Sequence, residues 1–233
     1  MADKPRVSKP RVKAPKQRTT PDPRAAAERR RMLMYGGGAL ATLAAAAVIV
    51  ALLGLAGGEP SPEDVRADLQ AAGCTLQAVK AQPGRHSLAP DGKAKWNTDP
   101  PTSGPHFGFN PDGSVGTVVW GAYAEPVQLA RVVHNLEHGG VYIFYGNRVA
   151  DPVVEQLRAF YDTHKNGTVL APYPKLGNQI ALGAWVAGGS GNGTGYLAKC
   201  KSFDEGAFSS FFDGFQFKGP EPHSADSLLP GGL

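Results

Sequence analysis

The sequence predicts a small α+β domain, in which a mixed or antiparallel sheet is backed by helices on one side, after one N-terminal transmembrane helix. Three observations lead to this class. Residues 32–58 carry no charge. Short apolar strand-like segments occur after residue 140, and amphipathic helical segments alternate with them.

The charge of the 233-residue chain is divided unevenly. Residues 1–31 hold 11 Lys+Arg and 3 Asp+Glu, a net of +8, whereas the remaining residues hold 13 and 17, a net of −4. The basic tail is rich in proline and nearly free of apolar residues, so we expect it to be disordered and cytoplasmic and to lie against anionic lipid. Because the basic charge lies outside the foldable region, the composition argues against nucleic-acid binding.

The uncharged segment 32–58 is long enough to cross a bilayer, which takes ~20 apolar residues. A secretory signal has a shorter apolar core of ~7–15 residues, although cleavage near "LAG" at 55–57 is an alternative, as is a buried core helix. The preceding "ERRRM" fits the positive-inside rule and places the later residues outside the cytoplasm. The predicted parts are a disordered tail at 1–31, the membrane helix at 32–58, a juxtamembrane helix at 59–73, an extracytoplasmic domain at 74–221 and a flexible tail at 222–233.

The chain has two cysteines, Cys74 and Cys200. In an oxidising compartment such a pair predicts a disulfide, and two free thiols are the alternative. A bridge closing this loop would contribute roughly 4–5 kcal/mol in chain-entropy terms.

The first part of the domain combines a helix with a long loop. Ser61 as N-cap and Pro62 at the first helical position predict a short helix over 61–73. Residues 81–117 are rich in Pro, Gly and Asn, which excludes a regular helix, and loops of this length are usually functional or disordered. Its aromatic residues Trp96, Phe107 and Phe109 predict that this loop packs onto the domain.

The second part predicts regular elements in close succession. A helix is expected over 126–138 with Gly139 as its stop, and a second helix is expected after Asp151 as cap. Strands are expected at 141–145, 168–174, 179–188 and 195–200, with the Gly-rich segment 188–195 as a hairpin tip. This order resembles the second half of a thioredoxin-like fold, but the chain has no Cys-x-x-Cys for thioredoxin redox chemistry.

The last helix contains a stripe of phenylalanines. Ser202 and Glu205 form a predicted capping box at its start. Four phenylalanines at helical spacing then predict a buried face, with a groove for a partner as the alternative: Phe208, Phe211, Phe212 and Phe215.

The segment "HNLEH" is the strongest candidate for chemistry. On a helical wheel, His134 and His138 lie opposite the apolar face, so they face either solvent or the loop that carries His106. Histidines at i and i+4 can bind one metal ion, and His106 in "TSGPHF" is the best third ligand. Glu137 is a candidate ligand, outer-shell partner or base. Weaker options are Asp99, Tyr123, Glu125 and His86, while His164 and His223 look incidental. Ordinary solvated histidines are the alternative.

The same segment matches His-x-x-Glu-His, in which both histidines bind zinc and the glutamate activates water. Peptidases of that type are larger and need a distant acidic ligand. This pattern leaves a small metallohydrolase, with Glu137 as the catalytic base, as one further hypothesis.

Longer motifs give a resemblance. "NTDPPTSGPHF", "EPVQLARVVHNLEHGGVYIFY" and "APYP" followed by "ALGAW" are similar to a bacterial family of membrane-anchored extracytoplasmic domains of unknown function. The resemblance covers roughly residues 74–221, implies a similar architecture and carries the family's motif histidines over to His106, His134 and His138. It implies no reaction.

The sequence therefore predicts a single-pass membrane protein whose external domain binds a divalent transition metal through His106, His134 and His138. Imidazole suits zinc, copper(II) or iron, and methionine occurs only at positions 1, 32 and 34, which argues against a thioether copper(I) site. The expected partner is the lipid bilayer. The alternatives are a non-catalytic module that binds an envelope protein without metal and the small metallohydrolase.

Overall fold

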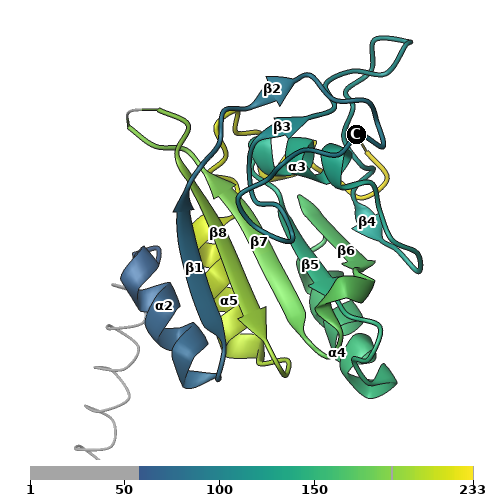
Figure 1. The fold of residues 1–233 in the computed structure, drawn as a ribbon. Helices are drawn as coiled ribbons and strands as arrows, with labels where there is room; N and C mark the ends of the chain where they lie inside the picture. The colour runs from purple at the N-terminus through teal and green to yellow at the C-terminus, as the bar shows by residue number, and fades with distance from the viewer. Residues whose placement is uncertain (1–57, 190, 233) are drawn as a thin grey trace, which may run out of the picture. The chain divides into compact units, whose positions relative to one another are not determined.

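A six-stranded mixed sheet forms the middle of the domain (Figure 1). The structure is a computed structural model that describes residues 58–189 and 191–232. In chain order the sheet strands are β1 (Thr75–Lys80), β4 (Gly121–Ala122), β5 (Val141–Tyr145), β6 (Thr168–Pro172), β7 (Ile180–Val186) and β8 (Thr194–Cys200). A separate parallel pair joins β2 (Arg85–His86) to β3 (Pro105–His106).

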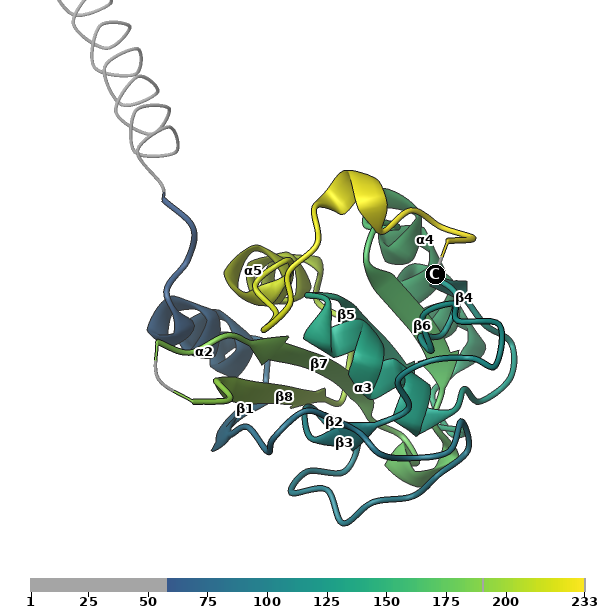
Figure 2. The ribbon, with the colours of Figure 1, turned by 90° about the horizontal axis from the view of Figure 1, so that it is seen from above.

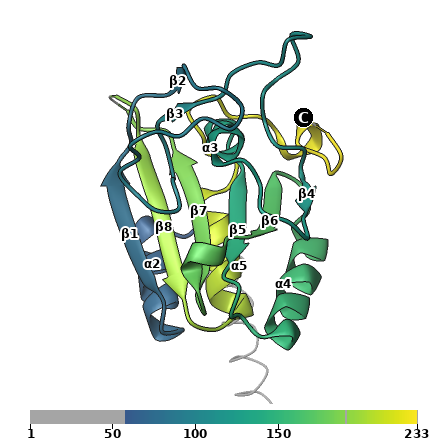
Figure 3. The same ribbon diagram turned by 45° about the vertical axis from the view of Figure 1, so that its right-hand side comes forward.

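The strand order across the sheet is β1-β8-β7-β5-β6-β4, which can be followed in Figure 3. The pairs β1/β8, β8/β7 and β7/β5 are antiparallel, whereas β5/β6 and β6/β4 are parallel. The parallel pair β5/β6 is joined through a helix, as such crossovers require. The sheet is therefore mixed, and the predicted α+β class is confirmed at that level.

Helices cover both faces of the sheet, which corrects the prediction of helices on one side. Helices α2 (Pro62–Ala71), α4 (Asp151–Thr163) and α5 (Glu205–Phe215) lie on one face, and α3 (Leu129–Glu137) lies on the other with β2 and β3 (Figure 2). The side chains of β5 alternate between two cores. Val141 and Ile143 pack on the first face, and Tyr142 and Phe144 pack on the second. A strand that is buried on both faces has no alternating polar positions, so its sequence does not show how many faces of the sheet the helices cover.

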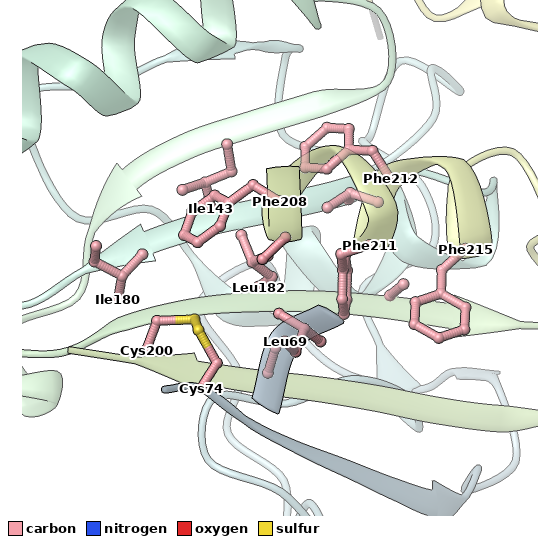
Figure 4. Packing of buried hydrophobic residues seen from close by; sticks show 14 of the residues in the cluster. Leu69, Cys74, Ile143, Ile180, Leu182, Cys200, Phe208, Phe211, Phe212 and Phe215 are labelled. Carbon is pink, nitrogen blue, oxygen red and sulfur yellow. A yellow bond between two sulfur atoms is a disulfide. The ribbon is translucent and has the colours of Figure 1, made fainter. Parts of the chain in front are cut away.

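The phenylalanine stripe of α5 is a core face, as predicted. Phe208, Phe211, Phe212 and Phe215 are all at most 2% exposed and pack toward the sheet and α2 (Figure 4). The same figure shows the disulfide between Cys74 and Cys200, which confirms the predicted bridge. The bridge ties the start of β1 to the end of the neighbouring strand β8.

The helix starts agree with the sequence in one case and differ in three. Helix α3 begins at Leu129 and not at residue 126. Ser61 and Asp64 form a capping box before α2. Helix α5 begins at Glu205, and its cap is Asp204, whose Oδ1 accepts from the backbone N–H of Ala207 at 2.9 Å, so Ser202 has no capping role. Asp151 is the first residue of α4 and not its cap.

The domain is longer at both ends than predicted. Residues Gly58–Leu233 cluster as one unit, and Val65 and Leu69 of α2 are fully buried in the first core. Helix α2 therefore packs as part of this unit. The segment expected to be a flexible tail from residue 222 contains a 3-10 turn, η2 (Ala225–Ser227), followed by the buried Leu228. A second short turn, η1 (Pro174–Leu176), precedes β7.

The predicted membrane helix cannot be compared with the structure, because residues 32–57 lie outside the described part of the chain. The same holds for the basic tail at 1–31. Among the residues that are described, no helix is both long enough and apolar enough to span a membrane.

Candidate metal centre

Helix α3 carries two of the side chains of the site. Its apolar residues Val132, Val133 and Leu136 pack onto the second face of the sheet. His134 and Glu137 lie three residues apart, on one side of the helix. Both are buried, with His134 1% and Glu137 6% exposed. The face that lies away from the sheet is thus covered by protein and not by water.

The cover is the long loop, as expected for the segment that carries His106. The backbone N–H of Phe107 donates to the carbonyl of Ala130 at 3.0 Å, which fixes strand β3 along α3. His106 itself is fully buried. Phe107 packs down and Trp96 is half-buried, but Phe109 is 56% exposed, which corrects the prediction for that residue. Phe109 lies at the rim of the site, with its ring centroid 5.3 Å from that of His86.

The fourth side chain comes from β2. The register of the short parallel pair places His86 next to His106. Two glycines allow the close approach of this part of the loop. A Cβ at Gly108 would stand 2.5 Å from the Cβ of His86, and one at Gly84 would stand 2.3 Å from Oε1 of Glu137. Both distances are shorter than atoms tolerate, so a side chain at either position would displace the site.

These four residues converge on one point. One ligand atom from each of His86, His106, His134 and Glu137 lies within 4.8 Å of all the others. Oε2 of Glu137 is 2.9 Å from Nε2 of His106 and 3.3 Å from Nε2 of His86. Around a tetrahedral zinc ion, neighbouring ligand atoms are ~3.3 Å apart, given bonds of about 2.0–2.1 Å. The two distances from Glu137 are close to this spacing.

Backbone carbonyls orient two of the rings. Nδ1–H of His106 donates to the carbonyl of Gly104 at 2.8 Å, and Nδ1–H of His134 donates to the carbonyl of Phe107 at 2.8 Å. A carbonyl only accepts, so in both residues Nδ1 carries the hydrogen, and when the ring is neutral Nε2 keeps a lone pair. Histidines that bind metals are usually oriented in this way.

The contact between His106 and Glu137 is the informative one. Nε2 of His106 is buried and has no hydrogen-bond partner among the described residues, although Oε2 of Glu137 stands 2.9 Å away. The carboxylate oxygen therefore lies off the direction in which Nε2 points. A lone pair and a negative oxygen at this distance repel each other unless a metal ion or a proton lies between them.

The protonation states suit metal binding. Burial, followed by the neighbouring His106 and His138, lowers the pKa of His134 from 6.5 to about 3, so this ring is neutral at pH 7. Burial alone would raise the pKa of Glu137, but the contacts with His106 and His86 outweigh it and leave the pKa lower than its ordinary value. A neutral His134 beside the carboxylate of Glu137 offers a lone pair and a negative charge to a divalent cation.

His138 lies beside this group and not in it. It caps the C-terminal end of α3, and its ring stacks on that of His134 with centroids 4.7 Å apart. Its Nδ1 faces the carbonyl of Glu221 at 3.3 Å. Of the three histidines predicted as ligands, the structure thus brings together His106 and His134, while His86 and Glu137 complete the group.

The remaining candidates lie elsewhere. Asp99 binds the hydroxyl of Tyr173, the hydroxyl of Tyr123 donates to the carbonyl of Val119, and His164 stacks on Phe160. The ring of His223 packs edge-on against that of His138, which lies outside the group. None of these residues, nor Glu125, belongs to the four-residue group.

The sequence offered little to identify His86. It follows Arg85 within the irregular loop, and its neighbour His106 is brought to it by a two-residue strand pair. Glu137 was recognised as a candidate because it is three residues after His134, which puts both on one side of a helix.

The chain belongs to the family described as "Protein of unknown function (DUF3105)", which matches residues 87–227. The expected membership in a family of unknown function is therefore confirmed. The match includes His106, His134 and Glu137 and begins one residue after His86. No curated protein and no solved structure matches this chain.

Proposed function

We propose that the domain binds one divalent transition metal ion through Nε2 of His86, His106 and His134 and a carboxylate oxygen of Glu137. Zinc, copper(II) and iron are the metals that such a set of imidazole and carboxylate ligands suits. The proposal keeps His106 and His134 from the sequence prediction. It moves His138 to an outer position, where its ring supports His134 by stacking.

The observation that carries this proposal is the convergence of ligand atoms from four side chains on one point, where the buried Nε2 of His106 lies 2.9 Å from Oε2 of Glu137. Two Nδ1–H groups held by carbonyls turn lone pairs toward the same point. A shared cation removes the repulsion between these groups and satisfies each of them. No other group of three or more such side chains with this convergence occurs among the described residues.

The site is open to solvent at one side chain. The side chain of His86 is 36% exposed, whereas those of His106 and Glu137 are 0% and 8% exposed. A metal ion can therefore enter past β2 and the rim residue Phe109. An opening of this kind also leaves room for a water molecule or an external ligand on the metal.

The geometry does not favour the metallohydrolase alternative. In the His-x-x-Glu-His mechanism both histidines bind the metal and the glutamate remains free as a base. Here Glu137 lies at ligand distance and His138 lies outside the group. The alternative of an interaction module loses the partner groove that the last helix was considered to offer, because the phenylalanines of α5 are buried in the core.

A comparison of His86 and His138 tests the set of ligands. We expect His86→Ala to weaken zinc binding more than ~100-fold, since a ligand is lost. We expect His138→Ala to weaken it ~10-fold or less, as for residues that only support a ligand. Competition with a chromophoric chelator measures both affinities. Equal losses in the two variants, or a larger loss in His138→Ala, would identify His138 as a metal ligand and contradict this assignment.

We further propose that residues 32–58 anchor the chain in the cytoplasmic membrane, with the basic N-terminus inside and the domain outside. The disulfide supports this location, because such bridges persist in oxidising compartments. The charge difference between the tail and the domain supports the same orientation. A reporter enzyme active only outside the cytoplasm, fused after residue 233, should be active. Activity only of a cytoplasmic reporter at that position would contradict the orientation.

A further inference from the structure

A small cavity lies at the C-terminal end of α3, on the outer side of His138. Its volume is about 90 Å³. The segment before β4, the end of α3 and the C-terminal segment surround it, and its lining consists of Val115, Thr117, Trp120, His138, His223, Ser227 and Leu228. None of these residues belongs to the proposed metal ligands.

Three polar atoms of this lining are buried and lack hydrogen-bond partners within the described residues. They are Oγ1 of Thr117, Nε1 of Trp120 and Nε2 of His138. Thr117 and Trp120 are only 3% and 1% exposed. A buried polar group without a partner costs about 1–3 kcal/mol, so three in one cavity indicate that something else binds them.

The chemistry of these atoms limits what can bind. The indole Nε1–H of Trp120 can only donate, and the hydroxyl of Thr117 can donate or accept. Nδ1 of His138 faces the carbonyl of Glu221, so its Nε2 is an acceptor. The lining contains no Lys, Arg, Asp or Glu. Apart from the imidazoles of His138 and His223, the lining offers a charged molecule no counter-charge, and a charge without a partner is costly to bury.

We propose that this cavity is a second binding site, which takes one small uncharged group that both accepts and donates hydrogen bonds, such as a primary amide. Its carbonyl accepts from Nε1–H of Trp120 and from the hydroxyl of Thr117, and its N–H donates to Nε2 of His138. The methyl groups of Val115 and Leu228 contact its apolar part. This site is distinct from the metal centre, although the stacked rings of His138 and His134 connect the two.

Fluorine NMR of the full chain tests the proposal. The chain has three tryptophans, Trp96, Trp120 and Trp185, so incorporation of 5-fluorotryptophan gives three signals, which single Trp→Phe variants assign. Acetamide is the probe. We expect saturable movement of the Trp120 signal alone. We also expect Thr117→Val to weaken acetamide binding by about twofold to tenfold, the effect of one hydrogen bond.

Ser227→Ala is the matched control. Ser227 lines the same cavity, but its hydroxyl already donates to the carbonyl of Ser224 at 2.7 Å. We therefore expect unchanged affinity for acetamide in this variant. An unmoved Trp120 signal, an equal drift of all three signals, or unchanged affinity in Thr117→Val would overturn the proposal. In each case the cavity would hold water only.

The same spectra separate this proposal from the metal proposal. The ring of Trp185 lies 6.3 Å from that of His106, so zinc should move the Trp185 signal. If zinc does not move the Trp185 signal while acetamide still moves the Trp120 signal, only the metal proposal is contradicted. If zinc moves the Trp185 signal while acetamide does not move the Trp120 signal, only the cavity proposal is contradicted.

Discussion

Glu137 contacts two histidines at once, and its role decides between a binding site and a catalytic one. As a ligand, its carboxylate oxygen would bind the metal directly. As a base, it would stay off the metal and act on a water molecule. Its Oε2 is 2.9 Å and 3.3 Å from the nitrogens of His106 and His86, which supports the first role.

We expect Glu137→Gln to weaken zinc binding more than ~100-fold, because the amide is uncharged and donates where the carboxylate accepts. The affinity is measured by chelator competition on protein whose circular dichroism spectrum is unchanged. Retained metal together with loss of a hydrolytic activity would instead identify Glu137 as a base.

The depressed pKa of His134 predicts a pH dependence of the metal-free protein. Burial lowers this pKa from 6.5 to about 3, so between these values the unfolded chain binds a proton that the native chain does not. Stability is therefore present above pH 6.5 and is lost as the pH falls toward 3. We expect the urea midpoint to decrease between about pH 7 and about pH 5, and to decrease less in His134→Gln. Equal slopes for the two proteins would contradict the buried, neutral state of His134.

At the residue scale, the sequence was informative where a local pattern exists. The helical wheel placed His134 away from the apolar face, and the Gly-Pro-His segment marked His106. Nothing local marked His86, because a two-residue strand pair brings it to the site. The spacing i, i+4 predicted His138 as a ligand, but this spacing does not show that Glu137 turns toward the loop while His138 caps the helix.

The element that builds the site is the long loop over α3. It supplies two of the proposed ligands from β2 and β3 and covers the remaining two. Because the loop has little regular structure, its position depends on close contacts such as that of Gly84 with Glu137 and Trp185. A Cβ at Gly84 would lie 3.0 Å from the indole of Trp185, in addition to its clash with Glu137.

We expect Gly84→Ala to weaken metal binding by about tenfold or more, because the loop has to move away from Glu137 and takes His86 with it. The matched control is Gly189→Ala, since a Cβ at Gly189 meets no atom within 4 Å. Zinc titration and thermal unfolding are measured for both variants. Equal affinities would show that the position of the loop does not determine the site.

At the element scale, the prediction succeeded for helices and strands with strong periodicity or clear stop signals. Gly139 ends α3 with a positive φ of 89°, as its sequence suggested. The arrangement of helices on both faces was missed. Strands β5 and β7 are apolar on both sides, so their pattern does not tell one covered face from two.

The whole domain is held together by two cores on opposite faces of one sheet. The disulfide belongs to the core opposite the site and closes a sequence separation of 126 residues. We expect the double variant Cys74→Ser/Cys200→Ser to lose ~2–5 kcal/mol of unfolding free energy, measured by denaturant titration, and to keep its metal affinity. Loss of the metal in a folded double variant would show that the two faces are coupled.

The central claim is that this domain holds a metal ion, and elemental analysis tests it most directly. The full chain is purified without chelator beside the His106→Ala/His134→Ala double variant, with circular dichroism to confirm an unchanged fold. The account predicts about one zinc, copper or iron ion per chain in the wild type and none in the variant. No metal in the wild-type protein, even after incubation with zinc and copper(II), would contradict it.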